Sequence, residues 1–167
     1  IRGKFNEFIT YDFAKKVGYA LGKSLKKEAP IVIGRDPRDS GYVILDAIKT
    51  GLNLANKTII DVGICPTPAV PFIIKRFGCS SGIMISASHN PPEYNGIKIF
   101  DQNGKKLKNI YEKNLEKAIQ EKNPLDTSSK HIKENIKNPS LLEFYEDSLI
   151  NSMGNENLEG IKIILDT

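Results

Sequence analysis

The chain has 167 residues, of which 40% are hydrophobic and 26% are charged. This length is typical of one domain, or of one domain with the beginning of another, and the apolar share is sufficient for a buried core. The formal net charge is +4, from 24 basic and 20 acidic side chains. Such a small excess suits an anionic small molecule as ligand, but it is too dilute to predict a nucleic-acid-binding surface.

The cysteine content and the length of the apolar runs indicate the cellular compartment of the protein. Cys65 and Cys79 are too few and too irregularly spaced for a zinc site or a disulfide framework, so we interpret each as a small core residue. No signal peptide is recognisable, and no apolar run is long enough to cross a bilayer. We therefore expect a protein of the reducing cytoplasm, with no membrane and no nucleic-acid partner. The oligomeric state is left open.

Three amphipathic helices are expected in the first 80 residues, at positions 10–28, 40–54 and 69–77. Thr10 or Asp12 can cap the first helix, and Asp39 or Ser40 can cap the second. Gly78 is expected to end the third.

Short apolar segments between these helices are typical of buried strands. The expected strands cover residues 31–33, 58–62, 82–85 and 97–100. Strands that alternate with helices predict an α/β fold, a three-layer α/β/α domain. The fourth strand returns after the turn signal Asn95-Gly96, so we expect it to run antiparallel to the third, in a mixed, mostly parallel four-stranded sheet.

The second half of the chain is more polar. We expect a charged helix over 109–122, an irregular exposed connection over 123–137, and an amphipathic helix over 140–153 that packs its apolar side inward. Residues 160–167 show a new strand pattern that lacks a partner. We therefore expect residues 1–156 to form one domain and residues 157–167 to begin a second, truncated domain.

The stretch from Gly82 to Phe100 consists of two expected strands and the polar loop between them. Its chemically active side chains are Ser86, Ser88, His89, Asn90 and Lys98. Ser88 is a candidate nucleophile with hydrogen-bonding and cationic groups nearby, and loops held between rigid strands are a common place for chemistry. The simpler interpretation is a structural turn, since serine, asparagine and proline favour turns. Against that interpretation stands the concentration of reactive groups in one short hairpin-like unit.

A serine-hydrolase site is disfavoured for this loop. Neighbouring residues of an extended chain point to opposite faces, so His89 is badly placed to accept the proton of Ser88. Ser88 also does not stand in a G-x-S-x-G motif.

Four short motifs occur in order within the first hundred residues. They are Ile1-Arg2-Gly3, the segment 34–41 (GRDPRDSG), the segment 65–69 (CPTPA), and the segment 86–91 (SASHNP) followed by 95–98 (NGIK). Together they resemble the motifs of the α-D-phosphohexomutase superfamily, which comprises phosphoglucomutases, phosphomannomutases and phosphoglucosamine mutases. The resemblance covers nearly the whole chain.

The resemblance implies a chemistry for Ser88. This residue would be carried as a phosphoserine and would donate its phosphoryl group to a hexose phosphate. A bisphosphate intermediate would then turn over and return its other phosphate to Ser88, so that phosphate moves between O1 and O6 of the sugar. Phosphoryl transfer depends mainly on alignment and charge neutralisation. Mg²⁺ is implied as the cofactor, bound to the Ser88 phosphate, with its other ligands in a second domain that this chain does not include. We expect the chain by itself to be inactive.

The resemblance also suggests roles for neighbouring residues. Lys98 resembles the family's lysine that accepts a proton or neutralises charge; the alternative is a lysine that protects a strand edge. Arg2 resembles an active-site arginine of the family. His89 would orient the loop or contact the phosphate, with a purely structural role as the alternative. We assign Ser86 a structural or tuning role, and we expect the Asn90 side chain to brace the turn through the backbone.

The segment Arg35-Asp36-Pro37-Arg38 has two interpretations. A turn before a helix can place cations near a phosphate. Alternatively, Arg35 or Arg38 pairs with Asp36 or Asp39 and fixes the start of the helix. We favour the second, structural interpretation.

The substrate and the class of function have alternatives. The loop resembles the phosphoglucosamine mutase branch, which implies glucosamine phosphate, but Pro92-Glu93-Tyr94 also fits phosphomannomutases and phosphoglucomutases. A non-catalytic sugar-phosphate-binding module of the same fold is a further alternative, disfavoured by the presence of Ser88 and Lys98. A nucleotide-binding domain is disfavoured because the chain has neither G-x-G-x-x-G nor a P-loop.

Overall fold

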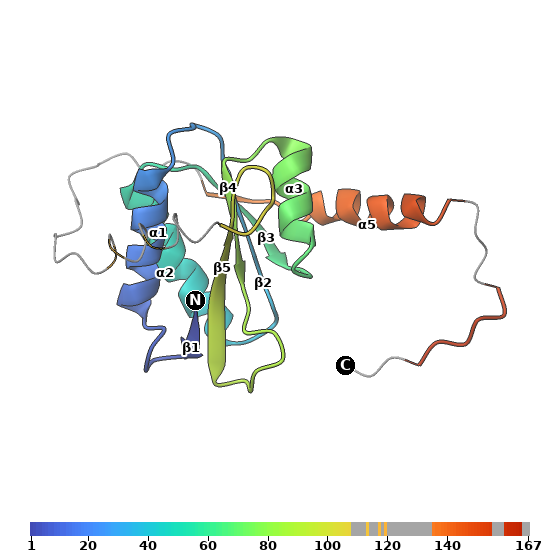
Figure 1. Cartoon of the computed structure of the whole chain (residues 1–167), viewed down its shortest axis with the longest axis horizontal. Helices are drawn as coiled ribbons and strands as arrows, with labels where there is room; N and C mark the ends of the chain where they lie inside the picture. Colours follow the sequence, from blue (N-terminus) through green and yellow to red (C-terminus); the bar gives the residue numbers. More distant parts are fainter. Residues whose placement is uncertain (108–112, 114–116, 118, 120–134, 155–158, 165–167) are drawn as a thin grey trace.

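The computed structural model describes residues 1–107, 113, 117, 119, 135–154 and 159–164. The strands are β1 (Arg2–Lys4), β2 (Ile31–Arg35), β3 (Ile59–Ile64), β4 (Ser81–Ile85), β5 (Tyr94–Phe100) and β6 (Asn135–Lys137). The helices are α1 (Tyr11–Ser24), α2 (Ser40–Leu54), α3 (Ala69–Phe77) and α5 (Leu141–Ser152). The described strands form one sheet in the order β1-β5-β4-β2-β3-β6, with α1 and α2 on one face and α3 on the other (Figure 1).

The α/β/α class and the mixed sheet are confirmed. Strand β2 pairs in parallel with β3 and β4, and β3 pairs in parallel with β6, whereas β5 is antiparallel to both β1 and β4. The expectation of four strands is wrong, because the described residues already form six strands of the sheet. The two additional strands lie at the edges and have three residues each, which is too short for a hydrophobic pattern to show. Strand β6 also replaces the last part of the irregular connection expected over 123–137.

The central strands are buried on both faces. In β2, Ile31 and Ile33 belong to the core cluster under α1 and α2, whereas Val32 belongs to the cluster under α3. Strand β4 divides in the same way, with Ile83 on the first face and Met84 on the second. This period of two, with apolar residues on both faces, is what a sheet covered by helices on each side requires.

The boundaries of α1 and α3 follow local signals, whereas Asp39, at the N-cap position of α2, makes no side-chain capping hydrogen bond. The Thr10 hydroxyl accepts a hydrogen bond from the Phe13 amide at 3.2 Å and caps α1, which ends at Ser24, four residues before the expected end. The bounds of α3 agree with the prediction, and Gly78 follows it in the left-handed conformation. None of the helices in the described part of the chain is both long and apolar enough to cross a bilayer.

The expected inward packing of α5 is confirmed for some of its apolar side chains and wrong for others. Leu141 is buried, and Leu142 and Tyr145 pack against the core cluster under α3. Three other residues of the apolar side that was expected to pack inward, Phe144, Leu149 and Ile150, are 44%, 50% and 65% exposed, because the helix extends away from the sheet (Figure 1).

Some expectations concern residues that are mostly or partly outside the described ones. The charged helix over 109–122 is described only at residues 113, 117 and 119, which are helical. Residues 161–164 form no strand, and residues 165–167 lie outside the described part of the chain.

The position of the expected turn is wrong. Asn95 and Gly96 lie inside β5, and the chain returns through residues 86–93 instead. Asn95 is fully buried, its Nδ2 donates to the Ser40 hydroxyl at 2.8 Å, and Gly96 pairs with Arg2 of β1. These long-range partners override the local turn preference, although the antiparallel direction of β5 relative to β4 is confirmed.

Helices α1 and α2 approach closely at glycines, which gives a test of the packing. A Cβ atom at Gly51 would overlap the Lys15 carbonyl and lie 2.6 Å from the Tyr19 amide nitrogen. Gly51→Ala should therefore lower the free energy of unfolding by about 2 kcal/mol, as overpacking does. Gly41→Ala, in the same helix, meets no atom nearer than 3.5 Å and serves as the matched control. Urea denaturation that gives equal midpoints for the two variants would contradict this packing.

Candidate active site

The candidate site lies where β2 and β4 end. Their parallel register runs from Ile31 opposite Ser81 to Arg35 opposite Ile85, so both carboxyl ends reach the same edge of the sheet. The Asp36 amide donates to the Ile85 carbonyl at 2.9 Å, and this bond ties the turn after β2 to the loop after β4. In open α/β sheets, ligands bind beyond the carboxyl ends of the strands.

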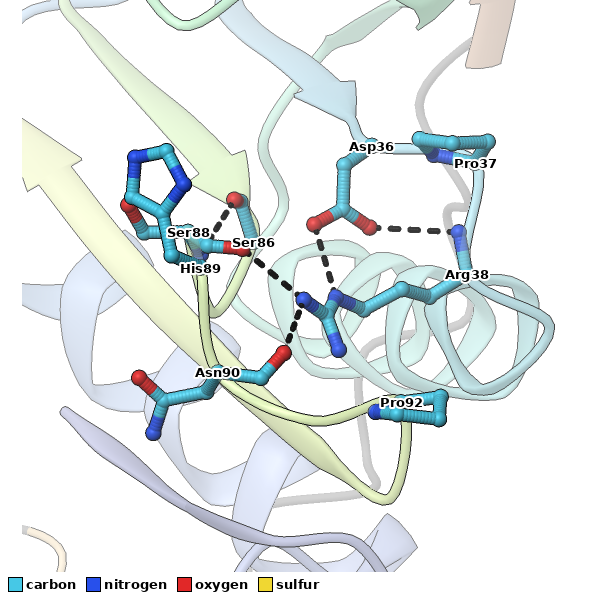
Figure 2. A pocket seen from close by; sticks show the side chains of 8 residues that line it. All are labelled: Asp36, Pro37, Arg38, Ser86, Ser88, His89, Asn90 and Pro92. Atoms are coloured by element: carbon cyan, nitrogen blue, oxygen red, sulfur yellow. Dashed lines mark hydrogen bonds and ion pairs between the residues drawn. The ribbon is translucent and has the colours of Figure 1, made fainter. Parts of the chain in front are cut away.

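A depression of about 460 Å³ lies between the turn and the loop (Figure 2). Its lining residues are Asp36, Pro37, Arg38, Ser86, Ser88, His89, Asn90 and Pro92. The volume is within the range of small-molecule sites. The structure therefore brings four of the loop residues considered in the sequence, Ser86, Ser88, His89 and Asn90, to one pocket.

Ser88 is exposed and has an unusual backbone. Its φ angle is +59°, in the left-handed region that non-glycine residues rarely adopt. The Ser88 amide donates to the Ser86 hydroxyl at 3.0 Å, and the Ser88 carbonyl accepts from the Arg38 guanidinium at 2.9 Å. Ser86 is buried at the end of β4. The backbone of Ser88 is thus held on both sides while its hydroxyl remains accessible.

His89 and Asn90 differ in their contacts. The His89 side chain is exposed at the pocket, and no hydrogen bond joins its ring to another residue in the described part of the chain. Asn90 was expected to bond the backbone of the turn, but its Oδ1 instead accepts from Arg2 Nη1 at 3.2 Å. Arg2, at the beginning of β1, thereby contacts the loop that carries Ser88.

Lys98 lies in β5 opposite Met84 and does not line the pocket. Burial lowers the pKa of Lys98, and the nearby charge of Arg2 lowers it further, while Asp36 opposes this with a smaller upward effect. Strand β1 pairs with β5 only from Tyr94 to Gly96, so Lys98 lies beyond that pairing and is opposite β4 alone. Lys98 is within electrostatic reach of Arg2 and Asp36.

Arg38 is the residue whose contacts sequence reasoning missed. It pairs with Asp36 at 3.0 Å, as one interpretation expected. Its other side-chain N–H groups donate to carbonyls from Ser88 to Tyr94, which lie 50 to 56 positions further along the chain. No local pattern reports contacts at such separations. Arg35 is buried, and its guanidinium lies 3.6 Å from the centroid of the Tyr42 ring.

The described residues do not make a complete metal site. No group of three or more His, Cys, Asp or Glu side chains among them is arranged to hold a metal ion. Asp36 is the carboxylate of the pocket, and its Oδ1 and Oδ2 accept from the backbone and side chain of Arg38. Mg²⁺ prefers six oxygen ligands in octahedral geometry. The described residues of this pocket would therefore supply few of these ligands apart from the oxygens of a phosphate on Ser88.

The electrostatic coupling of Lys98 to Arg2 can be tested directly. Arg2→Gln removes a positive charge that disfavours the Lys98 ammonium, so the pKa of Lys98 should rise toward its ordinary value. Arg76→Gln, on the exposed end of α3, removes the same charge elsewhere and should leave that pKa unchanged. NMR titration of ¹³C-dimethylated Lys98 measures both variants. An unchanged pKa in Arg2→Gln would show that Arg2 does not act on Lys98.

Comparison with known proteins is consistent with this arrangement. Residues 1–126 match the family described as phosphoglucomutase/phosphomannomutase, alpha/beta/alpha domain I. A phosphoglucosamine mutase of Prochlorococcus marinus (strain MIT 9215) is 57% identical over 100% of this chain, and one of Synechococcus sp. (strain WH7803) is 37% identical over 99%. The chain spans 37% and 36% of the lengths of these two curated relatives.

A solved structure supports the same relationship. A phosphoglucomutase/phosphomannomutase family protein from Burkholderia thailandensis superposes with a TM-score of 0.67 and 28% identity, over 83% of this chain and 31% of that one. The family match covers most of the chain and includes the Ser88 loop. The chain therefore belongs to the phosphoglucomutase/phosphomannomutase family, whose α/β/α domain I it carries.

Proposed function

We propose that this chain is the phosphoserine-bearing first domain of a phosphohexomutase. Residues 1–156 would form that domain, and residues 157–167 would begin the next one. The observation that carries the proposal is the position of Ser88, which is exposed at the pocket while its backbone is held in a left-handed conformation. A hydroxyl that must meet a sugar and exchange a phosphoryl group needs both access and a fixed direction.

The proposed reaction exchanges phosphate between Ser88 and the sugar. The bond from the Ser88 Oγ to phosphorus breaks as a free hydroxyl of a hexose monophosphate bonds to that phosphorus, which gives a bisphosphate. The proton of this hydroxyl passes to a base, and the departing Ser88 Oγ takes up a proton. After the bisphosphate reorients, Ser88 Oγ loses that proton and bonds to the other phosphorus, while the bond from this phosphorus to the sugar oxygen breaks and the sugar oxygen takes up a proton. The net result is an isomerisation between the 1-phosphate and the 6-phosphate.

Lys98 and Arg2 are the proposed partners of this transfer. A lysine whose pKa is lowered is neutral at a lower pH than an ordinary lysine, so Lys98 is suited to accept the proton of the sugar hydroxyl. Arg2 adds a fixed positive charge beside the loop and bonds Asn90. His89, exposed at the pocket, is proposed to contact the phosphate or the sugar.

Mg²⁺ is the proposed cofactor of the longer protein. A phosphate on Ser88 would supply one oxygen ligand, and the remaining ligands would come from a part of the protein outside this chain. When bound, the ion would neutralise charge on the transferring phosphoryl group. We expect this chain alone to lack mutase activity.

Glucosamine phosphate is the proposed substrate. Its support is the 57% identity to a phosphoglucosamine mutase over the whole of this chain. Mannose and glucose phosphates are the second candidates, favoured by the likeness to a phosphoglucomutase/phosphomannomutase family protein. A cytoplasmic location is proposed with the two buried cysteines, both free thiols, as its support.

Mass spectrometry of the full-length protein tests the phosphoserine. Incubation with glucose 1,6-bisphosphate and Mg²⁺ should add one phosphoryl group to the wild type and none to Ser88→Ala. Ser86→Ala should still accept a phosphoryl group, although its mutase rate should fall about tenfold because Ser88 loses one backbone contact. A phosphoryl group retained in Ser88→Ala would refute the assignment of Ser88.

Isomerisation assays of the wild type then test the substrate. With Mg²⁺ and the bisphosphate, glucosamine 6-phosphate should give the highest kcat/KM of the three sugar phosphates. A preference for mannose or glucose phosphate would favour the second candidates. No isomerisation of any sugar would favour a non-catalytic module.

A further inference from the structure

The guanidinium of Arg38 has a full set of acceptors. Arginine carries five N–H bonds in its side chain, one on Nε and two on each terminal nitrogen. Nε donates to Asp36 Oδ2 at 3.0 Å. The four remaining donors meet main-chain carbonyls, those of Pro91 and Tyr94 from Nη1 at 2.7 and 3.1 Å, and those of Ser88 and Asn90 from Nη2 at 2.9 and 2.7 Å.

These four carbonyls span the loop from the nucleophile to the first residue of β5 (Figure 2 shows the Ser88 and Asn90 bonds). The direction of the guanidinium is fixed from the other side, because Asp36 accepts from both the backbone and the Nε of Arg38. Asp36 itself is tied to β4 through the bond of its amide to the Ile85 carbonyl. The Arg38 side chain, which is 15% exposed, therefore attaches four carbonyls between Ser88 and Tyr94 to the end of the sheet, in addition to the contact of Arg2 with Asn90.

These hydrogen bonds distinguish a structural role of Arg38 from a phosphate-binding one. An arginine that binds phosphate must have N–H groups free to meet phosphate oxygens, usually two in parallel. Arg38 lines the pocket but has no N–H group left for a ligand, so its charge near the site is not a phosphate contact.

We propose that Arg38 is the positioning residue of the Ser88 loop, which holds the Ser88 hydroxyl in the direction that phosphoryl transfer requires. The proposal rests on the proposed function of Ser88 for its catalytic consequence, but not for its structural one. Without the bond from Nη2, the Ser88 carbonyl can rotate, and the backbone can leave the left-handed region for a more favourable one.

Lysine cannot replace arginine in this role. An ammonium has three donors at one point and cannot serve carbonyls on two sides, whereas the planar guanidinium presents five donors in a fixed fork. Arg38→Lys therefore keeps the positive charge and removes the brace. Arg76→Lys, at the exposed end of α3, is the matched control.

The experiment measures kinetics and hydrogen exchange of the full-length protein. For Arg38→Lys we expect kcat to fall about 10- to 100-fold, because the Ser88 hydroxyl is no longer held in the reactive direction. KM for the sugar phosphate should change less than about threefold. Backbone amides of residues 86–94 should exchange faster in Arg38→Lys, while those of α3 and all amides in Arg76→Lys keep their wild-type rates. Asp36→Asn should give a smaller change of the same kind, and it replaces Arg38→Lys if that variant does not fold.

The outcomes separate this inference from the proposed function. Wild-type kcat with unchanged exchange in Arg38→Lys would overturn the inference, and so would a raised KM with unchanged kcat, which would indicate a phosphate-binding charge. The wild type could also show no mutase activity while residues 86–94 exchange faster in Arg38→Lys. That result would refute the proposed function but support the role of Arg38 in holding the loop.

Discussion

The parallel pairing of β2 with β4 is the constraint on which the site depends. Because Arg35 lies opposite Ile85, the turn that follows one strand and the loop that follows the other must leave the sheet side by side. Asp36 and Arg38 belong to the turn, and Ser86 and Ser88 belong to the loop. Every contact between them follows from this register, and a slip by one residue would turn the side chains of β4 to the opposite faces of the sheet.

The energetics of the loop are a balance of strain against hydrogen bonds. Holding Ser88 in the left-handed region costs about 1–2 kcal/mol. A hydrogen bond to a charged group contributes about 1.5–3 kcal/mol, and Arg38 donates four such bonds to the loop. Even after a discount for solvent at this half-buried site, the bonds exceed the strain. The buried sheet is thus the rigid part, and the loop is kept in place by polar contacts that leave its tip accessible.

Local chemistry in the sequence predicted the parts of the fold that local forces decide. Thr10 caps its helix, and Gly78 ends α3, because each acts on residues within one turn. The alternation of helices and strands was enough to predict three layers. The turn at Asn95-Gly96 failed for the opposite reason, since burial of Asn95 against Ser40 and pairing with β1 depend on residues far away in the chain.

The same limit applies to the candidate site. Family motifs pointed to the loop and to Ser88, and the structure gives that residue an exposed side chain at a pocket. The contacts of Arg38 could not be predicted, because the carbonyls that accept its hydrogen bonds come close to it only when β2 and β4 pair in the folded sheet. The short edge strands β1 and β6 escaped detection for a related reason, since three residues carry too little pattern.

A crystal structure of the phosphorylated full-length protein would test the central claim most directly. The account predicts electron density for one phosphate on Ser88 Oγ, directed into the pocket, with Ser88 still in the left-handed region and Arg38 bonded to the same four carbonyls. A phosphate on another residue, or an Arg38 that has left the carbonyls to bind the phosphate, would contradict it.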